Sequence, residues 1–561
     1  MEVLPLRAEG RGGGGARPTR SLRAGLILTL LVAVVALALF TLHTLEVTNP
    51  YVYRHIAHIE ILKREGVVSG SFTADSGYSF GFVDLYPAHE TFLGSLSLVT
   101  GLSGQDLQFA PIMGVILLIL FYALARRATD SSVLAAIVSA SAIGLVAIPS
   151  LQLHNTYYYS MSVALYYVFL LAFVRLLQSP THLRSRVLLL LVVFSTAFLV
   201  HHRMALWMIL LPLVVGLYRL RLPAKAAGTG GRLPALLPLS TAFLVMYLAF
   251  NKTVYDQYLP KVNALEPVAA VTDAVSGLVN IVLREPGAAE AFRYGSSVGL
   301  LPLADASVII SMLAFNLWLL IPGVAFFILK VVPILVRSVS RREYPGQALD
   351  SDTLVGIALL VVLPLDTLIY LLLGRASALY LILTFPFLSL LALRQIGSKT
   401  LVVASFVLVL VVLSAFRFGV TWQHNFFQRE TRYSDVEASA QWLLHRTETT
   451  PTLIADMDNF GKYQVLGAGR GRFFNWTWYT SELYSALVRH EPLDAHSGKF
   501  LVVDLKSADT PIQSFFWGSY EPIDTYLPQI ETNTQLNAVY DDGTMRLLTV
   551  RSPQLERRQT Q

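Results

Sequence analysis

The sequence contains no cysteine among its 561 residues. Disulfides, thiolate nucleophiles and cysteine-ligated metals are therefore excluded, and outward-facing parts must be held by ordinary packing. Charged residues are also scarce, at 14% of the chain, against roughly a quarter in an ordinary soluble domain. Hydrophobic residues reach 54% and the mean hydropathy is +0.55. This composition excludes a soluble enzyme.

The hydrophobic residues form long uninterrupted runs. As helices, such runs cross most or all of a hydrocarbon core about 30 Å thick. The sequence thus predicts a polytopic α-helical membrane protein with about eleven transmembrane helices. The predicted spans are residues 25–42, 107–125, 131–149, 158–178, 186–200, 204–219, 234–250, 306–336, 352–373, 377–394 and 400–416.

Positive charge follows the orientation expected of a membrane protein. Arginines precede the first predicted span, and with the N-terminus inside, every Arg-rich short loop falls on the same side. The opposite short loops hold almost no Lys or Arg; residues 150–157, for example, have none. The net charge of +6 is therefore explained by basic residues in the cytoplasmic loops of a protein of the plasma membrane. No nucleic-acid partner is expected.

The same rule decides how residues 88–102 are interpreted. A span there would move Arg126 and Arg127 outside, so this apolar stretch is predicted to be an interfacial helix on the outer side. The N-terminal run is interpreted as an uncleaved anchor, although a signal peptide shares its basic and apolar pattern. The predicted organisation is a disordered cytoplasmic tail (1–24), a transmembrane domain (25–416) with outer loops at 43–106 and 251–305, and an extracytoplasmic region (417–561).

The composition of the C-terminal region is that of a soluble domain. Ser434–Leu444 shows helical periodicity, and 452–456 and 500–505 are typical of buried strands. Residues 539–550 predict a hairpin around Asp542-Gly543. We expect a small α/β domain, in which aromatic residues near Phe474 and Trp476 either stack on a bound ligand or form the core.

The first outer loop concentrates ionisable residues that the spans lack. A helix from about Tyr53 to Glu65 would place His55, Ile59 and Leu62 on one stripe, with His58 beside it. Both histidines would then face a common cavity. The alternative is a solvated helix next to the membrane.

A second informative stretch runs from Asp84 to Glu90. Pro87 disfavours helix at Tyr86 and suits the first turn of a following helix, so Asp84 and His89 flank a helix start. Asp84 is then either a cap or a carboxylate at the mouth of a cavity, acting as general base or metal ligand.

Further cationic residues gather at outer ends of predicted spans. His201, His202 and Arg203 lie between two spans with almost no loop, and Arg375 follows Gly374 at another outer end. An isolated Arg at the interface can simply snorkel. Together, however, these residues form the cationic cluster that would hold a lipid-linked phosphate.

This arrangement resembles the GT-C superfamily of integral-membrane glycosyltransferases, of the polyprenyl-phosphate-sugar-dependent kind that includes mannosyltransferases and aminoarabinose transferases. The local similarities are the segments 51–66, Tyr86-Pro87-Ala88-His89 with 96–103, His201-His202, and Gly374-Arg375 ahead of Tyr380-Leu381. The chain lacks a "WWD" motif, which argues against transfer of whole glycans to asparagine. The early acidic residue of the family is also replaced, by Thr48-Asn49-Pro50.

The resemblance implies transfer of a sugar from a polyprenyl-phosphate donor to a glycan, lipid or protein acceptor on the outer face. Asp84 or Glu46 would activate the acceptor hydroxyl, with His55 and His89 as polar or metal-binding neighbours. Arg375, His201, His202 and Arg203 would neutralise the phosphate. A divalent metal ion is the only cofactor that this interpretation leaves open.

Two alternatives compete with this hypothesis. A secondary transporter would carry polar or broken helices near mid-membrane and often internal repeats, whereas here no repeat is evident and the ionisable residues lie at one edge. A non-catalytic relative would use the same loops to assemble surface glycans by binding a partner.

Overall fold

The computed structural model describes most of the helical core and of the C-terminal α/β unit. The described segments are 51–66, 87–129, 132–141, 156–178, 182–220, 236–250, 323–341, 349–372, 431–470, 474–478, 492–508, 511–513 and 519–550, with isolated residues and short pieces elsewhere.

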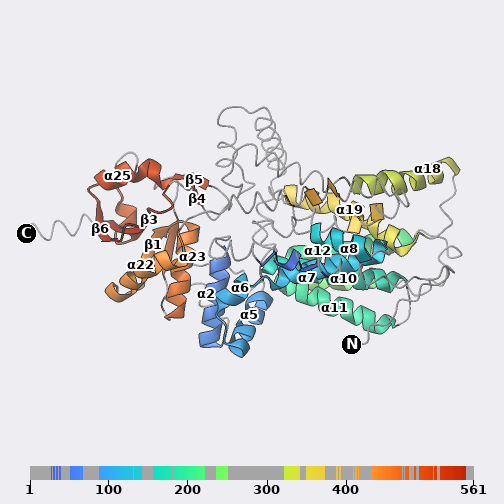
Figure 1. The fold of residues 1–561 in the computed structure, drawn as a ribbon, viewed down its shortest axis with the longest axis horizontal. Coiled ribbons are helices and arrows are strands. Elements are labelled where there is room, and N and C mark those ends of the chain that lie inside the picture. The colour runs from blue at the N-terminus through green and yellow to red at the C-terminus, as the bar shows by residue number, and fades with distance from the viewer. Residues whose placement is uncertain are drawn as a thin grey trace, which may run out of the picture.

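A bundle of apolar helices forms one end of the molecule (Figure 1). Its members are α7 (Ile112–Thr129), α8 (Ser132–Ser141), α10 (Tyr158–Gln178), α11 (Leu183–Val200), α12 (His202–Leu220), α13 (Leu236–Phe250), the π-helical turn η4 (Phe327–Val331) with α18 (Val332–Arg341), and α19 (Ser351–Leu372). Each lies within or overlaps a predicted span, so those spans are confirmed as helical over the described residues.

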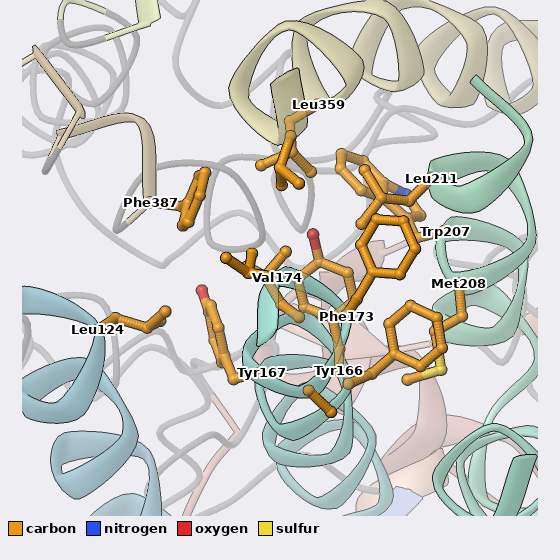
Figure 2. Packing of buried hydrophobic residues seen from close by; sticks show 14 of the residues in the cluster. Leu124, Tyr166, Tyr167, Phe173, Val174, Trp207, Met208, Leu211, Leu359 and Phe387 are labelled. Carbon is orange, nitrogen blue, oxygen red and sulfur yellow. The ribbon is translucent and has the colours of Figure 1, made fainter. Parts of the chain in front are cut away.

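Helix α10 is the centre of this bundle. Its aromatic side chains pack against several neighbours: Tyr167 meets Phe121 edge to face at 5.1 Å between ring centroids, and Tyr166 meets Trp207 at 6.0 Å. Leu359 from α19 also lies in this packed region, as Figure 2 shows. Dense apolar packing of this kind fixes how the surrounding helices are placed relative to α10.

Several helices meet the requirements for crossing a membrane. Among the described residues, three are long and apolar enough: Gly104–Arg126, Tyr158–Gln178 and Leu183–Val200. Met204–Tyr218 and Leu236–Ala249 are apolar but shorter. The chain is therefore a polytopic helical membrane protein, as the sequence predicts; the predicted total of about eleven spans includes segments outside the described residues.

Three helices lie between the bundle and the α/β unit (Figure 1): α2 (Tyr51–Glu65), α5 (Pro87–Thr100) and α6 (Gly104–Phe109). Helix α5 begins at Pro87, which confirms the predicted helix start. Ser103 caps α6 by accepting from the backbone N–H of Asp106 at 3.0 Å. The interfacial position predicted for residues 88–102 stays a prediction.

The C-terminal unit contains a five-stranded mixed sheet in the order β2-β1-β3-β7-β6. Strands β1, β2 and β3 are parallel, and β7 pairs antiparallel with both β3 and β6. The elements are α22 (Tyr433–Arg446), β1 (Thr452–Ala455), α23 (Met457–Gly469), β2 (Asn475–Trp478), η5 (Asp494–His496), β3 (Phe500–Asp504), β4 (Pro511–Gln513), β5 (Ser519–Pro522), η6 (Ile523–Tyr526), α25 (Leu527–Thr532), β6 (Leu536–Asp541) and β7 (Met545–Val550).

Alternation along the strands gives this sheet an apolar layer on each face. Leu453 and Ala455 pack with α22 and α23, whereas Ile454 points to the opposite layer, which includes Ile530 of α25. The predicted helix at 434–444, both predicted strands and the hairpin around Asp542-Gly543 are confirmed. Phe474 is fully buried in the first layer, which favours a core role for that aromatic residue.

The end of the sheet where the parallel strands β1 and β3 finish carries a buried polar network. Asp504 accepts hydrogen bonds from the Thr431 hydroxyl at 2.5 Å and from the Asn459 amide at 3.1 Å. Asn459 also donates to Asp456 at 2.8 Å, and the Lys462 ammonium donates to the Thr431 carbonyl at 2.7 Å. These bonds join the chain entering the unit to two of its strands and to α23.

Helix α23 also packs on α2, which connects the α/β unit to the first predicted outer loop. Val465 and Ala468 share an apolar cluster with Tyr53, Ile56 and other α2 residues. Arg64 donates to the Ala468 carbonyl at 3.1 Å. One side of α2 is therefore covered by a segment hundreds of residues later in the sequence.

Candidate functional site

Helices α2 and α5 bring two histidines and a glutamate together. Nδ1 of His55 lies 2.5 Å from Oε1 of Glu90, and Nδ1 of His58 lies 4.0 Å from the same oxygen. The three-residue spacing on α2 places both imidazoles on neighbouring positions of one face. Glu90 lies in the first turn of α5, where the helix dipole favours a negative charge.

A third histidine, His89, lies on the other side of this carboxylate. Its Nε2 donates to the Thr156 carbonyl at 3.1 Å, and its Nδ1 lies 3.8 Å from Oε2 of Glu90. Because a carbonyl only accepts, Nε2 carries the proton, and Nδ1 of the neutral ring then carries the lone pair. We call His55, His58, His89 and Glu90 the His/Glu cluster.

The cluster is withdrawn from solvent: Glu90 is 2% exposed and His89 is 0% exposed. Burial raises the pKa of the Glu90 carboxyl, but the charge and hydrogen bond of His55, together with the other two imidazoles, outweigh burial. The pKa of Glu90 therefore lies well below its usual value, and the carboxylate is ionised. A buried anion among imidazoles can take part in proton transfer or hold a cation.

Aromatic rings border the cluster on the side of α10. The His55 ring lies 5.5 Å from the ring of Tyr157 and 5.1 Å from that of Tyr158. The Tyr158 ring stacks on His201, with 5.3 Å between centroids and 28° between planes. Thus a continuous row of rings leads from the His/Glu cluster to the junction of α11 and α12.

Close packing between α2 and α5 sets the geometry of the cluster. A Cβ at Gly94 would lie 2.5 Å from Cδ2 of Leu62, so the absence of a side chain permits this approach. Ile59, Leu93 and Leu107 form a small buried cluster between α2, α5 and α6. Oε1 of Glu60 accepts from the Gly104 backbone N–H at 2.8 Å, which joins α6 to α2.

The structure brings together some of the predicted site residues. His55 and His89 both lie beside Glu90, and His201 is joined to them through Tyr158. The common cavity predicted for His55 and His58 stays a prediction, although both of these histidines face Glu90. His202 and Arg203 occupy the first turn of α12, but their side chains lie outside the described residues. Asp84, Glu46 and Arg375 also lie outside them, so their predicted roles stay predictions.

Glu90 lies at the centre of the cluster, although the sequence alone assigns it no role. One signal was available: Glu90 follows His89 in the first turn of the helix that Pro87 begins. The tyrosines at 157–159 were also missed, because the sequence shows them only as the start of an apolar span. For His58, the sequence predicts a position beside His55 but no separate role.

The cluster contains a possible metal-ligand set. His55, His58 and Glu90 each offer one ligand atom, and these atoms lie within 4.8 Å of one another. All three residues are buried. This is the one such group of three or more among the described residues.

No protein-family profile matches the sequence, and no curated protein matches it. Among solved structures, the chain is similar to that of ArnT from Cupriavidus metallidurans bound to undecaprenyl phosphate. The identity is 14%, the TM-score is 0.48, and the match covers 94% of this chain and 98% of that chain. The apo structure of the same protein matches with 16% identity, a TM-score of 0.47 and the same coverages.

Proposed function

We propose that the protein is a membrane glycosyltransferase that transfers a sugar from a polyprenyl-phosphate donor to an acceptor hydroxyl on the outer face of the plasma membrane. The observation that carries this proposal is the His55–Glu90 contact inside the buried His/Glu cluster. Its location on helices of the first predicted outer loop agrees with the resemblance to GT-C enzymes.

The cluster supplies what activation of a hydroxyl requires. An ionised carboxylate orients the imidazole beside it and stabilises the positive form of that ring, so an imidazole of the cluster in its neutral form can accept a proton from the acceptor. Alternatively, the same side chains hold a cation that polarises the hydroxyl. Asp84 or Glu46 complete this half of the site in our proposal.

The other half of the proposed site would bind the donor phosphate. His201 is joined to the cluster by the Tyr158 ring, and His202 with Arg203 begins the adjacent helix. Together with Arg375, these residues would neutralise the leaving phosphate. The intervening aromatic rings offer apolar faces on which a sugar ring stacks.

The experiment uses the full chain in proteoliposomes with labelled polyprenyl-phosphate hexoses and pentoses and with membrane extracts as acceptors. We expect label to move covalently from the lipid donor, and Glu90→Gln and His55→Gln to slow this transfer by about 10²–10⁴-fold. His445→Ala, which removes an exposed histidine from α22, is the control and should leave the rate unchanged.

Two results would overturn the proposal. One is that cells lacking the protein keep all their surface glycans and glycolipids while the proteoliposomes form no covalent product. The other is movement of an unmodified solute across the proteoliposome membrane, which would identify a transporter.

A further inference from the structure

We propose that the His/Glu cluster is a binding site for one divalent transition-metal ion of the zinc class, with His55, His58 and Glu90 as its ligands. Two imidazoles and one carboxylate form the ligand set of many catalytic zinc sites, in which a fourth position stays open to a reacting molecule. The three ligands come from two helices that are packed rigidly against each other through Gly94 and Leu62.

The distances fit an ion with only small side-chain adjustments. Zinc–ligand bonds of 2.0–2.1 Å in a tetrahedral arrangement separate neighbouring ligand atoms by roughly 3.3 Å. Here the three ligand atoms lie within 4.8 Å of one another, and Oε1 of Glu90 faces both histidines of α2. Reaching that spacing lengthens the His55–Glu90 separation of 2.5 Å and shortens the His58–Glu90 separation of 4.0 Å, each by less than about 1 Å.

The surroundings of Glu90 provide an independent argument for a cation. Within the described part of the chain, Oε2 of Glu90 and Nδ1 of His89 are buried and make no hydrogen bond. Nε2 of His89 is engaged by the Thr156 carbonyl at 3.1 Å, and its Nδ1 lies 3.8 Å from Oε2 of Glu90. A cation bound at the cluster would give Oε2 of Glu90 the partner that it lacks.

Thr156 and His89 would also act as the outer shell of the site. Metal-binding groups are generally oriented by such partners, whose removal typically costs 10–100-fold in metal affinity. His89 is held by the Thr156 carbonyl and lies beside the carboxylate, with 3.8 Å between its Nδ1 and Oε2 of Glu90. We therefore assign His89 as a positioning residue of the metal site.

The chemistry of the ligands selects the class of ion. Imidazole nitrogens suit zinc, copper, iron and nickel, whereas magnesium and calcium prefer sites made of oxygen atoms. With two nitrogens among three ligands, the site should discriminate against magnesium. A bound ion of this class would supply Lewis-acid polarisation of a hydroxyl at its open position. This catalytic role rests on the proposed function, but binding of the ion does not.

The test uses the full chain, purified in detergent with an affinity tag that contains no histidine. Metal content is measured by mass spectrometry after dialysis against trace zinc, and cobalt(II) is then titrated while its visible absorption is recorded. We expect roughly one ion per chain and a tetrahedral cobalt spectrum. Glu90→Gln and His58→Ala should each weaken binding by at least 100-fold, and His89→Ala by about 10–100-fold.

His445→Ala is the matched control and should bind as the wild type does. If a variant does not fold, chelator removal and cobalt reloading of the wild-type protein still report on the site. Absence of a stoichiometric ion from the wild type, or unchanged binding in both ligand variants, would overturn the proposal. Because these measurements need no sugar donor, a bound metal without transferase activity would contradict only the proposed function.

Discussion

Nδ1 of His55 lies 2.5 Å from Oε1 of Glu90, and the two residues are buried and 35 positions apart in the sequence. The His55 imidazole stabilises the Glu90 carboxylate, because without it a buried negative charge would lack its nearest partner in a low-dielectric environment. The contact is therefore both the centre of the candidate site and a link between α2 and α5.

The His55–Glu90 contact predicts that a double variant is more stable than one of its single variants. His55→Ala leaves a buried carboxylate without its partner and should destabilise the protein by about 3–5 kcal/mol. His55→Ala combined with Glu90→Gln removes the charge as well, and should be less destabilised than His55→Ala alone. Thermal unfolding followed by tryptophan fluorescence gives the order. Equal or lower stability of the double variant would contradict the electrostatic coupling.

The close approach of α5 and α2 gives a second prediction. Gly94→Val should overpack against Leu62 and cost about 1–3 kcal/mol. Adding Leu62→Ala should recover part of this loss, since it removes the atoms that a Cβ at Gly94 would meet. Ser95→Val, at the neighbouring exposed position, controls for the lower helix propensity of valine. Thermal unfolding midpoints of the wild type and the three variants test this prediction. No recovery of stability in the double variant would contradict the explanation.

Two glycines of α23 differ in their surroundings and should respond differently to the same change. A Cβ at Gly467 would lie 2.5 Å from the carbonyl oxygen of Arg472, which cannot move without the backbone. Gly467→Ala should therefore destabilise the α/β unit by about 1–3 kcal/mol. Nothing lies within 4 Å of a Cβ at Gly469, so Gly469→Ala should be nearly neutral. Protease resistance of the unit on heating distinguishes the two; similar effects would contradict the packing argument.

The start of α22 predicts a dependence of stability on pH. Burial raises the pKa of Asp435, but hydrogen bonds from Lys506 and from the Arg432 backbone N–H outweigh burial and lower it. A lowered pKa in the folded state stabilises the fold above the unfolded value of about 3.9, and this contribution disappears as the pH falls through the folded pKa.

Asp435→Asn should therefore reduce stability at pH 7 by roughly 0.5–1 kcal/mol, after allowance for solvent screening. The difference from the wild type should shrink as the pH falls below about 3.9. Unfolding midpoints recorded between pH 7 and the acid limit of the protein provide the comparison. Glu437→Gln, an exposed position on the same helix, should stay within about 0.5 kcal/mol of the wild type throughout. A constant difference for Asp435→Asn would argue against this account.

Local periodicity predicted the elements that depend on local burial. The spacing of His55 and His58 indicates a shared face whatever the fold, and residues 452–456 are typical of a buried strand. Pro87 marks the start of α5 for equally local reasons. All three expectations are confirmed.

The contacts that complete the site depend on packing between distant segments. Glu90 meets His55 because α5 packs against α2, with Gly94 close to Leu62, and the sequence does not show which helices pack together. Likewise, Asp456 and Asp504 become neighbours only through the order of the parallel strands. Ionisable residues in one loop can be expected to cluster, but their partners follow from the tertiary fold.

Because α23 covers α2, α2 cannot complete its packing until α23 has been synthesised. Arg64 and its partner Ala468 are 404 residues apart, and elongation proceeds at about 5–20 residues per second, so roughly 20–80 s separate their synthesis. During that interval the apolar side of α2 has no partner from α23. A ribosome that stalls before α23 leaves this helix half covered, so a truncated chain exposes a surface that quality-control proteases can recognise.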